Sequence, residues 1–122
     1  MIPPVPKRLL PHSAELVTSY DPDIWGEPSY SDSVWLENVR IEPLSKLITD
    51  SSGAIKKLSA VLFFDCRNSS PAVKFALKGD DADGRTVDIQ QVIFDGRTFT
   101  VQSIETFYAD RGKIHHYEVG LI

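Results

Sequence analysis

The stretch Val92-Ile-Phe-Asp-Gly-Arg-Thr-Phe-Thr-Val101 decides the fold class of this chain. Its centre, Asp95-Gly96, is a dipeptide that takes up positive φ at both central positions of a type I′ turn, which joins two antiparallel strands. The flanking residues 87–94 and 98–108 are rich in β-branched and aromatic side chains, which favour strands. The sequence therefore predicts a β-hairpin at this position.

Further strands are predicted on both sides of the hairpin. Residues 14–20, 33–43, 57–65 and 113–122 have strand composition, and 44–49 can continue the second of them. Residues 57–65 are apolar on both faces in their second half, which predicts a central, buried strand. A total of about six or seven strands with short turns is typical of a small antiparallel β-barrel or sandwich, so the predicted fold class is all-β.

The apolar alternation changes parity at two places. In the strand 33–43 the change comes near Glu37 and Asn38, and in the strand 98–108 it comes near Gln102 and Ser103. Because successive side chains of a strand point to opposite faces, each change predicts a β-bulge.

Two segments depart from the strand pattern. Residues 1–13 contain four prolines, which remove backbone donors, so an extended arm is predicted there. Residues 66–86 are predicted to form a long loop. Within it, Ser70-Pro71 and the later Gly79 are typical of the start and end of a short helix at 70–79, with an irregular loop as the alternative.

The composition is that of a single small domain, which we assign to residues 14–122. Lys and Arg number 13 against 17 Asp and Glu, and this net charge of −4 disfavours tight nucleic-acid binding. The longest apolar run, 60–64, is too short to span a bilayer, and the first residues lack the pattern of a secretory signal. We therefore expect a reducing cytoplasm, where the single cysteine, Cys66, would be a small buried side chain.

No motif that could carry catalysis or hold a cofactor stands out. Residues 79–86 have the spacing of a phosphate-binding loop, but three carboxylates would repel a phosphate, and a calcium loop would need carboxylates at its two ends. His115 and His116 are adjacent in a strand, so they should point to opposite faces and not chelate one metal ion together. The sequence thus predicts no enzyme, no cofactor and no metal site. An enzyme that pairs one of these histidines with an acidic residue is an alternative.

Aromatic residues offer a candidate interface. Trp25 and Trp35 lie near predicted turns or edges, where they could contact a partner or, equally, seal the ends of a barrel. A further alternative function is an oligonucleotide-binding type of barrel or another non-catalytic interaction module. It would need aromatic and basic residues such as Phe99 and Arg97 on one face, although several carboxylates lie nearby in the sequence.

Five stretches, taken in order, carry a resemblance to a known family. They are Trp25-Gly-Glu-Pro28, Glu37-Asn-Val-Arg-Ile-Glu-Pro43, Leu62-Phe-Phe-Asp-Cys-Arg-Asn-Ser-Ser-Pro71, the hairpin Val92 to Val101, and His115-His-Tyr-Glu-Val-Gly-Leu-Ile122. Over nearly its whole length the chain resembles the minor capsid proteins of tailed bacteriophages and of prophages of Gram-positive bacteria. It departs from their pattern at the acidic stretch 78–88, which is longer here.

The resemblance implies a structural virion protein at the head–tail junction, assembled in the cytoplasm of the bacterial host. A stopper- or adaptor-like head-completion subunit would form a ring with copies of itself, contact portal and tail proteins, and surround passing double-stranded DNA without tight binding. It implies no membrane partner and no catalytic residues. We predict that the long loop faces the channel or a neighbouring ring through Lys74, Phe75, Lys78, Asp80, Asp81, Asp83 and Arg85.

Overall fold

The computed structural model describes residues 3–21, 31–49, 52–82, 84–109 and 112–122. After a 3-10 turn, η1 (Lys7–Leu9), the strands are β1 (His12–Tyr20), β2 (Ser31–Thr49), β3 (Ile55–Asp65), β4 (Asp81–Ala82), β5 (Arg85–Phe94), β6 (Arg97–Tyr108) and β7 (Ile114–Leu121). The described residues contain no α-helix, and none of them forms a helix able to cross a membrane. The all-β prediction is therefore confirmed.

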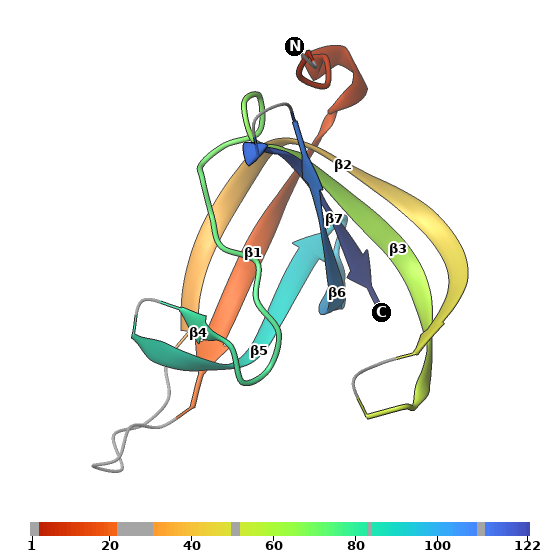
Figure 1. Cartoon of the computed structure of the whole chain (residues 1–122), viewed down its shortest axis with the longest axis vertical. Coiled ribbons are helices and arrows are strands. Elements are labelled where there is room, and N and C mark those ends of the chain that lie inside the picture. Colours follow the sequence, from red (N-terminus) through yellow and green to blue (C-terminus); the bar gives the residue numbers. More distant parts are fainter. Residues whose placement is uncertain (1–2, 22–30, 50–51, 83, 110–111) are drawn as a thin grey trace.

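The strands form one antiparallel sheet whose ends meet. Its order is β1-β2-β3-β7-β6-β5-β4, and an additional pairing of β1 with β5 closes it into a ring of strands (Figure 1). β3 lies between β2 and β7, as its two apolar faces predicted. Closure gives the chain an interior toward which alternate residues point, most regularly in β1 and β3.

The local predictions around turns and bulges are confirmed. Asp95 and Gly96 have φ of 51° and 73°, as the type I′ turn between β5 and β6 requires. Asn38 has φ of 56° where the β1–β2 register shifts, and the β6–β7 register shifts between Val101 and Ser103. These irregularities are where the sequence pattern changes parity.

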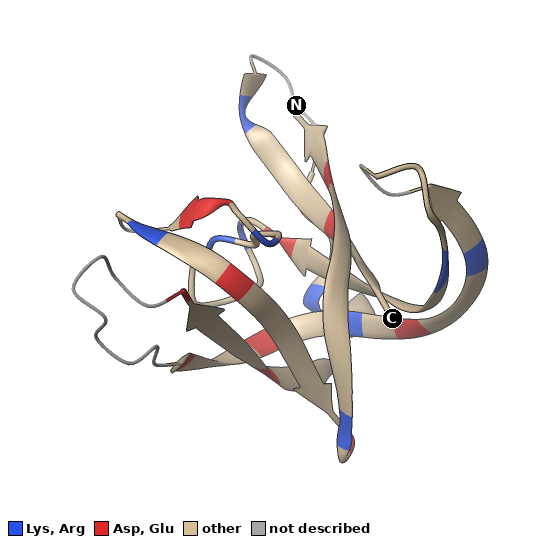
Figure 2. Cartoon of the chain, turned by 90° about the horizontal axis from the view of Figure 1, so that it is seen from below, with Lys and Arg blue, Asp and Glu red and all other residues tan. Residues whose placement is uncertain are grey.

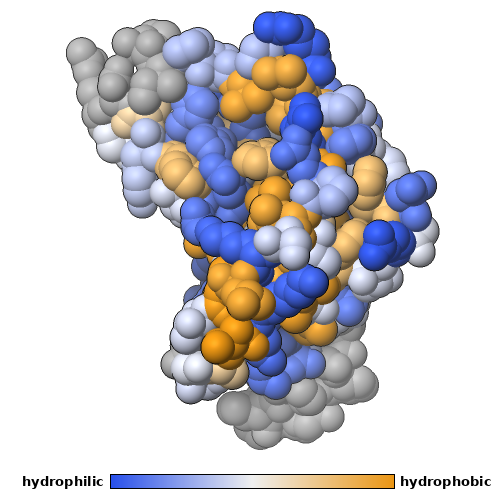
Figure 3. Space-filling model, turned by 90° about the vertical axis from the view of Figure 1, so that its right-hand side faces the viewer, coloured by the Kyte–Doolittle hydropathy of each residue, from blue (hydrophilic) through white to orange (hydrophobic). Residues whose placement is uncertain are grey.

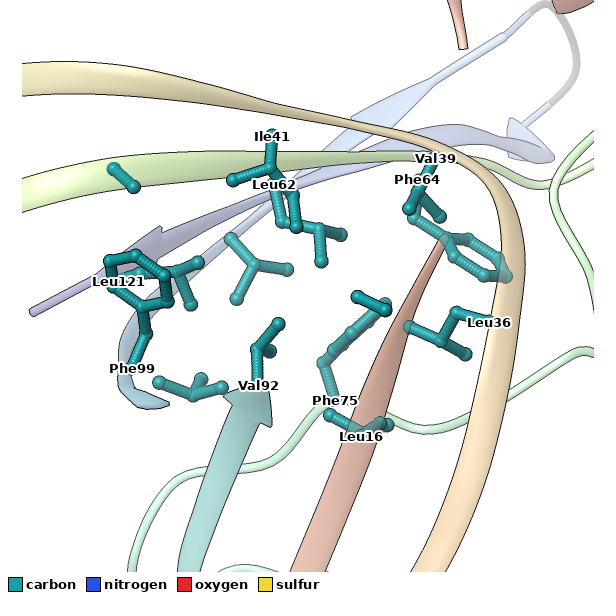
Figure 4. Close-up of a cluster of buried hydrophobic side chains, with 14 residues drawn as sticks. Leu16, Leu36, Val39, Ile41, Leu62, Phe64, Phe75, Val92, Phe99 and Leu121 are labelled. Carbon is teal, nitrogen blue, oxygen red and sulfur yellow. The ribbon is translucent and has the colours of Figure 1, made fainter. Parts of the chain in front are cut away.

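The core fills the closed sheet with side chains from six strands and from one loop. Leu36, Leu62 and Leu121 are fully buried within it. Phe75, from the loop after β3, inserts among strand side chains such as Leu16 and Leu36 (Figure 4). Its ring meets Phe64 edge-on at 5.5 Å between centroids. The long loop is thus part of the hydrophobic core.

The short helix predicted at 70–79 is wrong, and the irregular loop is what forms. Ser70 pairs with Glu37 of β2 through two backbone hydrogen bonds of 2.8 and 3.1 Å. Further along, the Ala76 N–H donates to the side chain of Gln90 at 2.9 Å. Bonds to distant strands thus take the backbone groups that a helix would pair internally, and burial of Phe75 favours them.

The N-terminal arm is docked on the closed sheet. The Val5 N–H donates to the Asp65 carboxylate at 2.8 Å, and the Asn68 side-chain amide donates to the Val5 carbonyl at 2.7 Å. Leu10, after the 3-10 turn, is only 2% exposed. The arm therefore covers the ends of β3 and β7 before β1 begins at His12.

Candidate functional site

The loop between β3 and β5 carries the predicted channel residues and is fixed to the sheet by Gln90. This side chain is 2% exposed. Its oxygen accepts the Ala76 N–H at 2.9 Å, and its nitrogen donates to the Lys74 carbonyl at 3.0 Å and to the Thr18 hydroxyl at 3.1 Å. A long loop would otherwise be mobile, so this buried amide determines where the loop's charges stand.

Three charged side chains of this loop contact the loop backbone or the adjacent strand β5. The Asp80 carboxylate accepts the Leu77 N–H at 2.8 Å, and Lys78 Nζ lies 3.4 Å from Asp88 Oδ1. The Lys74 ammonium donates to the carbonyl of Asp81 in β4, and the Asp81 side chain itself is exposed.

The remaining candidates are Phe75, Arg85 and Asp83. Phe75 is 7% exposed and belongs to the core, so its assignment to a channel or interface surface is wrong. The Arg85 guanidinium stacks over the Tyr20 ring at 4.5 Å. Asp83 lies outside the described residues. The sequence could not show that Phe75 is buried, because the strand alternation that predicts burial elsewhere is missing from this segment.

Trp35 is the centre of an exposed acidic and apolar surface. It is 57% exposed, lies opposite Glu15 of β1, and Glu15 in turn lies opposite Ile93 of β5. We name this outward side of the three strands the Trp35 face; its members are Ser33, Trp35, Glu37, Glu15, Val17 and Ile93. The strand segments 12–20, 31–39 and 87–94 contain no Lys or Arg. Trp25, the other candidate aromatic, lies outside the described residues.

A second exposed surface was not predicted. β1 pairs with β2 only as far as Val39, and β7 pairs with β3 only from Ala60. Beyond these points β2 and β3 continue as a two-stranded projection, residues 43–49 and 55–59, which we name the hairpin tip. Leu47 and Ile55 are 67% and 69% exposed there, higher values than for the other exposed large apolar side chains of the described chain.

The hairpin tip is basic, in contrast to the rest of the chain. Its charged residues are Lys46, Lys56 and Lys57, all exposed, and none forms an ion pair with a described residue. Figure 2 shows the blue lysine positions of the tip on the side away from β4, and Figure 3 shows apolar and hydrophilic side chains intermixed on the side that includes the tip. The available sequence signal was the proximity of lysines to large apolar residues at 46–48 and 55–57.

The two histidines of β7 are linked to each other, which the expectation of opposite faces did not foresee. His115 Nδ1 lies 2.9 Å from His116 Nδ1, and His115 Nε2 lies 2.6 Å from the Pro3 carbonyl. His116 Nε2 lies 3.0 Å from the Glu118 carboxylate. The Phe107 ring stacks on the His116 ring, with 4.6 Å between the ring centroids. These contacts join β7 to the N-terminal arm.

A cavity of about 330 Å³ lies beside this network, under the docked arm. Its lining surface is mainly apolar and includes Val5, Leu10 and Phe63, and His116 and Asp65 also line it. Among the described residues no three His, Cys, Asp or Glu side chains come together as metal ligands.

Cys66 differs from its prediction. The side chain is exposed, because the chain leaves β3 at this residue; it was expected to be buried. Its backbone N–H donates to the His115 carbonyl at 3.1 Å. Partial desolvation, and then the neighbouring Asp65 carboxylate, raise the pKa of the thiol. The thiolate is therefore disfavoured at neutral pH.

The residues of the oligonucleotide alternative are not arranged to bind bases. Arg97 lies over the Phe99 ring at 5.3 Å, but Phe99 is 6% exposed and faces the core. A buried ring cannot stack on a nucleobase, which is the contact that such barrels use. The observed geometry gives this alternative no support.

Comparison with known proteins shows which family the chain belongs to. A model of the minor capsid protein family matches residues 6–121. No curated protein matches the chain. The matched segment contains every strand of the closed sheet, the anchored loop and the hairpin tip. This chain therefore belongs to the minor capsid protein family, whose members are structural components of the virion that contact other virion proteins.

Proposed function

We propose that this chain is a stopper- or adaptor-like head-completion subunit at the head–tail junction of a tailed phage or prophage. Copies of it form a ring around the DNA exit channel and contact portal and tail proteins. Family membership supports the structural role in the virion. The ring, the junction and the channel are the parts that the experiments below test.

The observation that carries this proposal is the exposed carboxylate of Asp81 on an anchored loop. Gln90 holds its first part, and two backbone bonds, from Gly79 N to Val87 O at 2.9 Å and from Val87 N to Asp80 O at 2.8 Å, hold its second part. Asp81 remains exposed on this support. A fixed carboxylate repels phosphates, so such a loop can line a DNA path without retaining the duplex.

Location in the particle is the first test. Antibodies against the folded chain, detected with gold particles on intact virions, should label one vertex, at the point where the tail joins the head. Label distributed over the whole capsid surface, or label along the tail, would contradict the proposal.

The role of the loop is tested by Asp81→Lys in assembled particles, with Asp81→Asn as the control. The side chain of Asp81 makes no described contact, so both variants should fold. The lysine variant should slow DNA ejection because it adds a cation beside the phosphates, whereas the asparagine variant should eject at close to the normal rate. If particles with Asp81→Lys eject DNA at the same rate as particles with the unmodified chain, the loop does not line the channel. Asp80 is less suitable for this test because it supports the loop itself.

A further inference from the structure

The hairpin tip and the Trp35 face are complementary surfaces that one chain cannot bring together. The tip projects on one side of the molecule, and β1 with the first half of β2 lies on the other (Figure 1). Trp35 and Leu47 are in the same strand, but Trp35 is paired with Glu15 of β1 and Leu47 with Lys57 of β3, so the closed sheet holds the two surfaces apart. A contact between the two surfaces therefore has to join different molecules.

The charges of the two surfaces are opposite. The tip and its connecting turn, residues 43–59, contain three lysines and one aspartate and so carry +2, which leaves −6 on the rest of a chain whose total is −4. The Trp35 face presents Glu15 and Glu37 and has no Lys or Arg in its strand segments. Neither set of charges has an ion-pair partner among the described residues.

Both surfaces also place apolar side chains beside their charges. On the tip, Leu47 pairs with Lys57 and Thr49 pairs with Ile55, so these four side chains share one side of the hairpin. On the other surface, Trp35 and Glu15 are cross-strand neighbours. An aromatic side chain surrounded by charge is the usual composition of the centre and rim of an interface.

We propose that the hairpin tip of one copy docks on the Trp35 face of the next copy, with Leu47 and Ile55 against Trp35 and Lys57, the lysine on their side of the hairpin, toward Glu15 and Glu37. The partner is a second copy of this chain. Because the two surfaces differ, the contact is head-to-tail, and repetition gives a closed ring when the rotation between copies closes. This inference specifies the contact within the proposed ring and so rests on the proposed function.

Cross-linking of the full chain tests the contact directly. In a Cys66→Ser background, Ser33→Cys places a thiol on the Trp35 face, and Thr49→Cys places one beside Ile55 on the tip; both original residues are exposed. A short bismaleimide should convert the double-cysteine chain, at high protein concentration and low salt, into a ladder of dimers, trimers and larger species. Each single-cysteine chain should give no ladder.

Two further variants decide whether the named side chains make the contact. Leu47→Ser with Ile55→Ser should lower the yield of the ladder on the order of tenfold, because the contact then buries less apolar surface. An unchanged ladder in this variant would overturn the proposal. Cross-linked dimers from a single-cysteine chain would also overturn it, because they indicate a symmetric contact.

Exchanging the charges tests the contact by recovery of the cross-linked ladder as well as by its loss. A chain with Lys57→Glu and a chain with Glu15→Lys should each lose the ladder, because like charges then meet at the contact. Mixed together they should recover it, because position 57 of each is then opposite in charge to position 15 of the other. Failure of the mixture to recover, with both chains folded by circular dichroism, would contradict the assigned pairing.

The outcome is distinguishable from failure of the proposed function. The same double-cysteine chain is cross-linked in assembled particles. A chain that labels the head–tail vertex but gives no ladder there overturns this contact alone. If the chain gives a ladder in solution but the gold label lies elsewhere in the virion, the contact stands and the proposed location is wrong.

Discussion

The side chains of His115 and His116 are hydrogen-bonded to each other through their Nδ1 atoms, 2.9 Å apart, although the residues are consecutive in β7. Only one Nδ1 of the pair can carry the shared hydrogen. The outer nitrogens face the Pro3 carbonyl and the Glu118 carboxylate. The pair therefore connects the N-terminal arm to the surface of β7.

Replacing His115 should loosen the arm without unfolding the sheet. His115→Ala removes the 2.6 Å contact with the Pro3 carbonyl and should cost about 1 kcal/mol. Amide hydrogen exchange of residues 5–10 should accelerate, while exchange in β3 should be unchanged. The matched control is Lys113→Ala, an exposed residue beside the same strand. Unchanged exchange in the arm would show that the histidine does not hold it.

Gln90 should be among the most sensitive polar residues of the chain. Gln90→Leu leaves the Ala76 N–H and the Lys74 carbonyl without their partner, and unsatisfied buried groups cost about 1–3 kcal/mol each. The free energy of unfolding, measured by urea denaturation, should fall accordingly. Gln91→Leu on the outward side of β5 is the control and should change stability by under about 1 kcal/mol. Equal losses in both variants would contradict the anchoring role.

Gly120 should not tolerate a methyl group. A Cβ at this position would clash with Ser103 Oγ and lie 2.9 Å from Leu58 Cδ1. Gly120→Ala should therefore destabilise the chain by about 1–3 kcal/mol, with Tm as the measurement. Adding Ser103→Ala removes the hydroxyl oxygen and should recover part of the loss. If the double variant is no more stable than Gly120→Ala, the hydroxyl is not the obstacle.

The exposed Cys66 should react more slowly than its accessibility suggests. Its raised pKa lowers the thiolate fraction at a given pH, and the thiolate is the reactive form. Alkylation by iodoacetamide at pH 8 should be slower in the folded chain than in urea, and the rate should rise at higher pH than for the unfolded chain. Because the unfolded chain loses the thiol proton at a lower pH than the folded chain, the free energy of unfolding should decrease as pH rises through the unfolded and folded pKa values of Cys66. A folded rate equal to the unfolded rate would refute the shift.

Local features of the fold follow from the sequence by itself. Asp95-Gly96 specifies its turn because positive φ at two successive positions depends on those residues alone. The parity changes near Asn38 and Gln102 locate bulges because the alternation of side chains is a property of one strand. The two apolar faces of β3 predict its central place for the same reason.

Only the tertiary structure decides the features that depend on distant partners. Segment 70–79 contains signals of a helix, but Glu37 and Gln90, which are far away in sequence, bind its backbone and keep it irregular. Phe75 is buried and Cys66 exposed because of what packs beside them. The separation of a basic hairpin tip from an acidic Trp35 face likewise arises when the sheet closes, because the far ends of β2 and β3 then pair only with each other and extend beyond β1 and β7. Burial and charge separation are sums over non-local contacts, which neither composition nor periodicity contains.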